Sequence, residues 1–132
     1  MTSRDNEDFF DGDVEKRTNP TLSHLAQQND AFRSGSDFHS PLMGSRLHTQ
    51  GIDALGLETV LDIWARVRAF SEFSVDNDPY GEHDFGSFDH PVAGKIFWKI
   101  DYYALDLKYG AEDPSDPLKT HRVLTVMLAI EY

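Results

Sequence analysis

The sequence predicts a single small α+β domain, in which an antiparallel sheet with a central hairpin packs against two or three helices. Two stretches, residues 20–34 and 53–69, repeat apolar residues at helical spacing, whereas residues 95–103 alternate apolar and polar residues as a strand does. The chain has 132 residues, and 39% of them are hydrophobic. This is enough for one hydrophobic core and too little for two packed domains.

Residues 1–18 have the composition of a disordered acidic tail. They contain six acidic and three basic residues and few large apolar ones. Their net charge of −3 leaves −8 of the chain's −11 on residues 19–132, which form the predicted domain. Most of the negative charge therefore belongs to the folded part of the chain.

The first helix is predicted to run from Asn19 and Pro20 to about Ser34. An Asn side chain can cap free N–H groups, and Pro at the first helical position has no N–H to satisfy. Gly35 supplies a plausible end. The buried stripe of this helix is predicted to contain Leu22, Leu25, Ala26, Asn29 and Phe32.

A short strand is predicted at residues 45–49 and a second helix at residues 53–69. The helix is indicated by the helical spacing of Leu57, Val60, Leu61, Trp64 and Val67. Near its end, Arg66 and Arg68 complement the helix dipole, so their position has a structural explanation.

The clearest strand comprises residues 95–103, with Ile96, Trp98, Ile100 and Tyr102 on one face. Lys99 and Asp101 are expected side by side on the other face. Residues 85–88 are predicted to pair with this strand as an antiparallel hairpin, through a turn rich in Pro and Gly.

The apolar run at residues 123–130 fits either a strand or a buried helix, because its periodicity does not separate the two. Asp116 and Pro117 just upstream resemble a helix cap, so a helix is predicted. Arg122 is accordingly expected on a helix surface. Surface positions are also expected for His24, His39, His48 and His90.

Charge and composition exclude several classes of protein. The net charge of −11 opposes contact with nucleic acid or an anionic membrane. Without cysteine the chain has no disulfide, thiolate zinc site or cysteine nucleophile. No apolar stretch approaches the ~18 residues of a membrane span, and a cytoplasmic location is expected.

Candidate functional residues gather in residues 76–89, here called the acidic segment. It contains five acidic residues, one histidine and three aromatic residues, but no Lys or Arg. Two like charges ~4 Å apart repel by about 4 kcal/mol at an effective dielectric constant of ~20. The carboxylates are therefore expected either to spread into water or to surround a cation.

The leading hypothesis is a non-enzymatic interaction protein, whose exposed carboxylates bind a basic protein surface such as that of a nucleic-acid-binding complex. Aromatic residues in the same segment would anchor such an interface. The candidate partner-binding residues are Asp76, Asp78, Tyr80, Glu82, His83, Asp84, Phe85 and Asp89.

Two alternatives remain open. The first is a hydrolase or nuclease that depends on a divalent metal, held by Glu82, His83, Asp84 and Asp101 as oxygen and imidazole ligands. An EF-hand is excluded, because its twelfth position would be Ser87 where a bidentate Glu is needed. The second alternative is a tight Pro-Tyr-Gly turn with solvated acidic side chains and no site.

Three strings carry a family resemblance: Asn-Asp-Pro-Tyr-Gly-Glu-His-Asp-Phe-Gly at residues 77–86, Trp-Lys-Ile-Asp-Tyr-Tyr at residues 98–103 and Thr-His-Arg-Val-Leu-Thr at residues 120–125. From about Asn29 to Tyr132 the chain resembles a bacterial family, number 3768 among the domains of unknown function. Ala104 departs from the acid that the family usually has there, which weakens a metal scheme that needs a carboxylate at this position.

The resemblance implies a context and no catalytic residues. Members of the family occur largely in proteobacteria, often on plasmids and other mobile elements. Small acidic proteins of such elements are often counter-defence factors that occupy a host nuclease or surveillance complex. The context implied by the resemblance therefore favours an inhibitor of a nucleic-acid-handling host enzyme. The leading hypothesis requires no cofactor, whereas the metal alternative requires a divalent ion.

Overall fold

The computed structural model describes residues 22–35 and 42–132 of the chain. The predicted tail at residues 1–18, the predicted cap at Asn19 and the predicted surface residue His39 lie outside these residues. The elements are helix α2 (His24–Ser34), strand β1 (Met43–His48), helices α3 (Gln50–Asp53) and α4 (Leu57–Ala69), strands β2 (Phe85–His90), β3 (Gly94–Tyr103) and β4 (His121–Leu128), and the 3-10 helix η1 (Ala129–Glu131).

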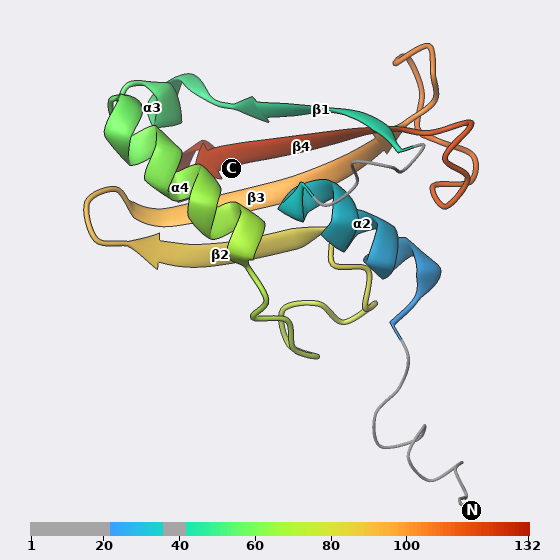
Figure 1. Ribbon diagram of the computed structural model, residues 1–132, viewed down its shortest axis with the longest axis horizontal. Helices are drawn as coiled ribbons and strands as arrows, with labels where there is room; N and C mark the ends of the chain where they lie inside the picture. The colour runs from blue at the N-terminus through green and yellow to red at the C-terminus, as the bar shows by residue number, and fades with distance from the viewer. Residues whose placement is uncertain (1–21, 36–41) are drawn as a thin grey trace, which may run out of the picture.

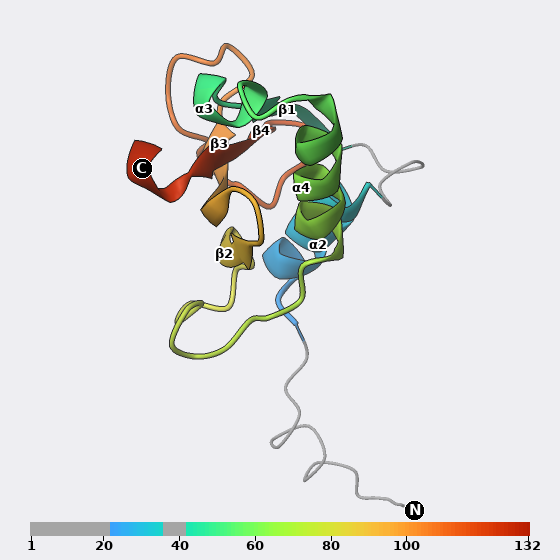
Figure 2. The same cartoon turned by 90° about the vertical axis from the view of Figure 1, so that its left-hand side faces the viewer.

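A four-stranded sheet in the order β1-β4-β3-β2 forms the centre of the fold (Figure 1). The pairs β2–β3 and β3–β4 are antiparallel, and β1 runs parallel to β4. Figure 2 shows α2 and α4 together on one side of the sheet. The predicted α+β class, with a hairpin in a mostly antiparallel sheet, is confirmed. In the described residues no helix is long and apolar enough to cross a membrane.

Helix α2 begins at His24, five residues after Asn19, and its N-cap is Ser23. The Ser23 hydroxyl accepts a hydrogen bond from the N–H of Ala26 (3.0 Å), and the extended backbone of Ser23 precedes the first turn. The predicted helix therefore begins too early, because Ser23 has an extended backbone and caps the helix. Leu22, predicted in the buried stripe, lies before the helix and is 46% exposed. The predicted end is confirmed, since Gly35 has the left-handed backbone (φ 78°) of a helix C-cap.

The predicted helix at residues 53–69 is interrupted, so that α3 and α4 are separate. Gly56, at φ 95°, allows the turn between them. At the other end of α4, the Arg33 guanidinium donates hydrogen bonds to the carbonyls of Val67 (3.1 Å) and Phe70 (2.9 Å). A side chain of α2 thus binds carbonyl groups at the end of α4.

The core lies between the two long helices and the sheet. Trp98 is fully buried, as predicted from the alternation in β3, and its indole packs edge-on against Phe70 with ring centroids 5.5 Å apart. The buried hydrophobic cluster consists of Phe32, Ile52, Val60, Ile63, Val67, Phe70, Ile96, Trp98, Ile100, Leu124 and Val126. On the opposite face of β3, Lys99 and Asp101 lie side by side as expected, with Nζ and Oδ2 2.6 Å apart.

The helix predicted for residues 123–130 is wrong, because residues 121–128 form β4. This strand has β1 on one side and β3 on the other, so both rows of backbone groups are hydrogen-bonded within the sheet. The face of β4 towards the helices buries Arg122, Leu124 and Val126, and the residues of its other face are partly or fully buried, so apolar residues occur on both faces. Asp116, which was interpreted as a helix cap, instead stabilises a turn. Its side chain accepts a hydrogen bond from the N–H of Leu118 (3.0 Å).

Two residues that were expected at the surface are buried. Arg122 lies on the helix-covered face of β4 with none of its surface exposed. His90, 6% exposed, has its Nε2 2.6 Å from a carboxylate oxygen of Asp62. Its Nδ1 accepts hydrogen bonds from the N–H groups of Val92 and Ala93, and so holds the β2–β3 turn. Sequence alone gave no sign of these partners.

Candidate functional site

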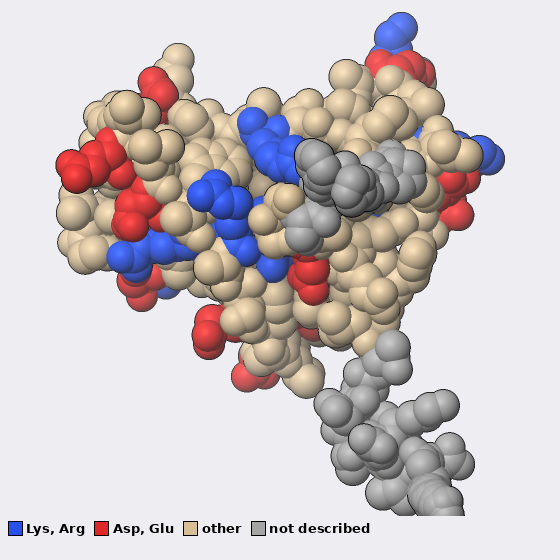
Figure 3. Space-filling model, in the orientation of Figure 1, with Lys and Arg blue, Asp and Glu red and all other residues tan. Residues whose placement is uncertain are grey.

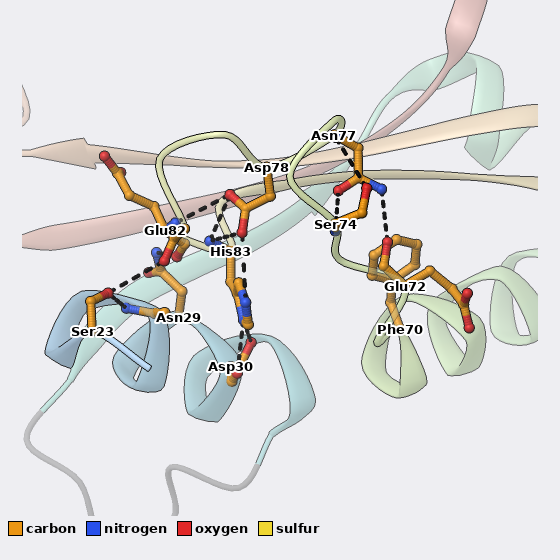
Figure 4. A network of polar contacts seen from close by, with 12 residues as sticks. Ser23, Asn29, Asp30, Phe70, Glu72, Ser74, Asn77, Asp78, Glu82 and His83 are labelled. Carbon is orange, nitrogen blue, oxygen red and sulfur yellow. Dashed lines mark hydrogen bonds and ion pairs between the residues drawn. The ribbon is translucent and has the colours of Figure 1, made fainter. Parts of the chain in front are cut away.

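The acidic segment runs as a loop to Asp84 and then continues into β2 (Figure 4). Its entry is fixed by Asn77, whose side chain accepts a hydrogen bond from the N–H of Ser74 (2.9 Å) and donates one to the carbonyl of Glu72 (2.8 Å). The Ser74 hydroxyl accepts one from the N–H of Asn77 (3.3 Å). These bonds set the direction in which the loop leaves α4.

Asp78 turns inwards and closes the Pro-Tyr-Gly bend. Its carboxylate accepts hydrogen bonds from the N–H groups of Glu82 (3.1 Å) and His83 (3.3 Å), and its side chain is only 7% exposed. The bend uses left-handed backbone at Gly81 (φ 67°) and at His83 (φ 57°). The tight turn of the second alternative therefore exists, and Asp78 is the residue that holds it.

His83 joins the loop to α2. Its Nδ1 lies 2.9 Å from a carboxylate oxygen of Asp30, and its Nε2 lies 3.6 Å from one of Asp78. The ring stacks flat on Phe73, with centroids 3.7 Å apart. Asp30 also accepts a hydrogen bond from Arg33 (3.1 Å). Both ring nitrogens thus face carboxylates of the chain itself, and the imidazole holds the loop against α2.

A buried polar layer continues from the loop to the sheet. The Asn29 side chain donates hydrogen bonds to the carbonyl of Glu82 (3.0 Å) and to the Tyr102 hydroxyl (2.8 Å). That hydroxyl donates to the Glu82 carboxylate (3.2 Å). Burial raises the pKa of Tyr102, so its hydroxyl stays protonated and remains a donor. One carboxylate of the acidic segment is therefore held by a side chain of β3.

Arg122 completes this layer. Its Nε donates to the Asn29 side-chain oxygen (2.9 Å), and one terminal nitrogen donates to the side-chain oxygen of Gln28 (2.9 Å) and the carbonyl of Pro114 (3.1 Å). Burial lowers the pKa of this guanidinium, which has no carboxylate partner among the described residues. Its neutral hydrogen-bond partners connect β4 to α2 and to the segment before β4.

Three of the four remaining carboxylates of the segment lack basic partners among the described residues. Within the described residues, Asp76, Glu82 and Asp84 form no ion pair with Lys or Arg, whereas Asp89 lies 3.4 Å from the Lys95 ammonium. Figure 3 shows the basic side chains of the helix-covered face gathered over its centre, away from the carboxylates of the loop below. The negative charge of the loop is thus not neutralised by the described basic residues.

Asp84 shows the effect of this uncompensated charge. Partial burial raises the pKa of its carboxyl, and repulsion from the carboxylates of Glu82, Asp78 and Asp101 raises it further. The ionised form of Asp84 is therefore destabilised in the folded protein.

The aromatic candidates of the segment lie in two places. Tyr80 is 87% exposed at the bend. Phe85 lies on the face of the sheet opposite α2 and α4, where its ring packs edge-on with Phe97 and Tyr132 at centroid distances of 5.3 and 5.7 Å. The Tyr80 ring is therefore available for contact, whereas Phe85 belongs partly to a local aromatic cluster.

The residues of the metal hypothesis do not converge on one point. The Glu82 carboxylate contacts Tyr102, the His83 ring contacts Asp30, and the Asp101 carboxylate contacts Lys99. Within the residues described here, no group of three His, Asp or Glu side chains is arranged to hold a metal ion. The geometry offers better support for a surface that contacts a partner.

Residues 48–131 match a family described as protein of unknown function, DUF3768. The match covers more than half of the chain. The chain belongs to the DUF3768 family. No curated protein and no solved structure matches it. The match to DUF3768 contains the acidic segment and strands β2, β3 and β4, and begins after the expected start near Asn29.

The residues that hold the acidic segment in this DUF3768 protein come largely from α2. Sequence reasoning missed Asp30 and Phe73 as partners of His83, and Asn29 was predicted only as part of a buried stripe. Asp30 precedes His83 by 53 residues, so no local spacing connects the two. A polar Asn in an apolar stripe was the available signal, because a buried amide needs hydrogen-bond partners.

Replacement of Asp84 by Asn is expected to raise the melting temperature at pH 7. The substitution removes a charge that the folded state disfavours. The raised pKa also fixes the sign of the pH dependence. As the pH falls through the raised pKa towards the ordinary value of 3.8, Asp84 becomes protonated in the folded protein. The difference in melting temperature between Asp84→Asn and the unsubstituted protein therefore becomes smaller.

Thermal unfolding of both proteins at several pH values measures this difference. Asp76→Asn is the matched control, because the side chain of Asp76 is exposed. A melting temperature of Asp84→Asn that equals or falls below that of the unsubstituted protein at pH 7 would contradict the prediction.

Proposed function

We propose that this DUF3768 protein is a non-enzymatic acidic binding module, and that its acidic segment contacts a basic surface on another protein in the cytoplasm. The observation that supports this most is the combination of a fixed loop with carboxylates that have no lysine or arginine partner among the described residues. A cationic partner surface would supply the missing charge.

Electrostatics favours such an encounter. The chain carries a net charge of −11, which attracts a basic partner over long distances and raises the association rate at low salt. Extended basic surfaces are typical of proteins that handle nucleic acid, because those surfaces contact phosphates. A loop of carboxylates could occupy a surface of that kind. Inhibition of a nucleic-acid-handling enzyme, the role of a counter-defence protein, is the proposed consequence.

The loop also has the features of a preorganised contact. Asp78, Asn77 and His83 already hold the backbone in one conformation, so little ordering is required on binding. Tyr80 projects from the bend with 87% of its surface exposed. Tyrosine is among the residue types that contribute most to interface energies. We therefore assign Tyr80 as the anchor and Asp76 as a charged contact.

The double variant Asp76→Asn/Tyr80→Ala is expected to bind the partner protein at least tenfold more weakly than the unsubstituted protein. A tenfold loss corresponds to about 1.4 kcal/mol, well below what a single anchor residue can contribute. The immobilised full chain is exposed to the heparin-binding fraction of a bacterial lysate in moderate salt. The proteins that it retains are then titrated individually against the purified variants.

The matched control is Glu112→Gln/Tyr109→Ala. It makes the same change in charge and also removes one exposed tyrosine, but in a different loop. Partner binding that withstands the control and fails in the Asp76/Tyr80 variant supports the proposal. Retention of no basic protein, or equal binding by the two double variants, overturns it.

A further inference from the structure

Strand β2 forms an open edge of the sheet next to the acidic segment. Among the described strands, its one neighbour in the sheet is β3. The N–H of Ile100 donates to the carbonyl of Asp84 (2.8 Å), which fixes the alternation of the antiparallel ladder. It follows that the peptide groups of Phe85, Ser87 and Asp89 point away from β3. Among the described residues, none of the three makes a backbone hydrogen bond outside the ladder.

A groove of about 260 Å³ runs beside this edge. It lies between β2 and the end of α4, which Figure 1 shows next to each other. Ala69, Phe70 and Phe88 give the groove an apolar part. Its complete lining is Arg66, Ala69, Phe70, Ser71, Glu72, Ser87, Phe88 and Asp89.

The charges along the groove favour a basic occupant. Glu72 and Asp89 contribute carboxylates, and both residues are exposed. Glu72 has no ion pair with Lys or Arg among the described residues, whereas Asp89 lies 3.4 Å from the Lys95 ammonium. The guanidinium of Arg66 is already paired with Asp62, 2.9 Å away. The edge is also continuous with the acidic segment, which enters β2 directly after Asp84. A second copy of this chain is disfavoured as the occupant, since each copy carries a net charge of −11.

We propose that an extended segment of the partner protein, bearing lysine or arginine, adds to the sheet as a fifth strand along β2. Its backbone pairs with the free peptide groups of Phe85, Ser87 and Asp89. Alternate side chains enter the groove beside α4, as in other cases where a peptide extends a sheet at its edge. This inference rests on the proposed function and specifies how the basic partner is held.

Strand addition has two requirements that a purely electrostatic contact lacks. The peptide backbone must supply donors and acceptors at alternate residues, and the β2 edge must supply its own N–H groups. A proline at position 87 removes one such N–H. Because that group points away from β3, the substitution breaks no hydrogen bond of the ladder. Ser87→Ala leaves the N–H in place and is the matched control.

The test uses a labelled acetylated peptide of alternating lysine and valine, seven residues long, and the full chain. Fluorescence anisotropy is expected to give saturable binding below 1 mM. Replacement of the lysines by glutamates is expected to weaken binding at least tenfold. Ser87→Pro is expected to weaken binding of the lysine peptide at least tenfold, whereas Ser87→Ala changes it less than twofold. Circular dichroism establishes that both variants fold.

A second measurement covers the case in which Ser87→Pro does not fold. The lysine peptide is N-methylated at alternate residues in each of the two possible phases and titrated against the unsubstituted protein. Strand addition requires that one phase abolishes binding and the other does not. Absence of binding at 1 mM, equal binding by Ser87→Pro and Ser87→Ala, or equal binding of both methylated peptides overturns the proposal.

The same variants separate this inference from the proposed function. Partner binding that depends on Asp76 and Tyr80 but withstands Ser87→Pro removes strand addition and leaves the acidic binding module in place. Partner binding that is indifferent to Asp76 and Tyr80 removes the proposed function itself, whatever the lysine peptide does at β2.

Discussion

Replacement of Asn29 by Ala is expected to lower the free energy of unfolding by about 3 kcal/mol, because buried groups that lose a hydrogen-bond partner each cost about 1–3 kcal/mol. Asn29 is fully buried. Its side chain bonds to the guanidinium of Arg122, to the hydroxyl of Tyr102 and to the carbonyl of Glu82. Alanine removes all three hydrogen bonds at once. Nε of the buried Arg122 then loses its partner, whereas the Tyr102 hydroxyl keeps the Glu82 carboxylate and the Arg122 terminal nitrogen keeps Gln28 and Pro114.

Urea unfolding, followed by circular dichroism, measures this loss. Gln27→Ala is the control on the same helix, since Gln27 is exposed and its side-chain hydrogen bond to Leu22 lies at the surface. That control is expected to change stability by less than about 0.5 kcal/mol, as is usual at surface positions. A change of this small size in Asn29→Ala as well would show that the buried layer does not contribute as its hydrogen bonds indicate.

The layer around Asn29 could not be derived from the sequence, for a physical reason. Its members come from α2, the acidic segment, β3 and β4, and the hydrogen bond from Arg122 to Asn29 spans 93 residues. Local spacing reports which residues share a face of one element. It does not report which faces meet. Arg122 was therefore placed on a surface, although its guanidinium donates to neutral groups of two distant segments, α2 and the segment before β4.

The hairpin shows the opposite case. Ile96, Trp98 and Ile100 recur at every second position of a long strand, and the turn before them contains Pro and Gly, so a local pattern was sufficient to predict the hairpin. Strand β4 lacked such a pattern. Burial alternates along most of this strand, but the sequence does not show it, because one buried position is Arg122 and the partly buried face also carries apolar residues.

The acidic segment was located by composition, but the roles within it were not. Five carboxylates in one segment predicted repulsion, and the raised pKa of Asp84 agrees with that expectation. Asp78 turns inwards and caps the bend, whereas Asp76 stays exposed. This difference in orientation depends on the local backbone. Composition gives the total charge of a segment, whereas the turn geometry decides which charges reach a partner.

Replacement of Gly86 by Ala is expected to destabilise the fold by about 2–3 kcal/mol, the range typical of overpacked cores. A Cβ at this position would lie 2.4 Å from Nε1 of Trp98 and 2.6 Å from Cε2 of the same indole. The indole cannot move freely, because it is fully buried between Phe70 and the guanidinium of Arg33, which lies 4.8 Å from the ring. Relief therefore requires a shift of either β2 or the core.

Such a shift would also reach the candidate site. Arg33 contacts Trp98 on one side and the Asp30 carboxylate on the other, and that carboxylate holds His83. Gly86→Ala is thus expected to weaken peptide binding at β2 as well as stability. Urea unfolding measures the stability, and Gly110→Ala is the control, since a Cβ there meets its nearest atom at 3.9 Å.

The origin of the loss can be assigned by a double-mutant cycle with Trp98→Phe. Phenylalanine lacks the pyrrole part of the indole that the new methyl group would strike, so Gly86→Ala should cost at least about 1 kcal/mol less in that background. An equal cost in both backgrounds would mean that the glycine is required for the backbone of β2 and not for the approach of Trp98. In that case Trp98 and Arg33 would not connect the β2 edge to His83, and the β2 edge and the acidic segment would be energetically independent.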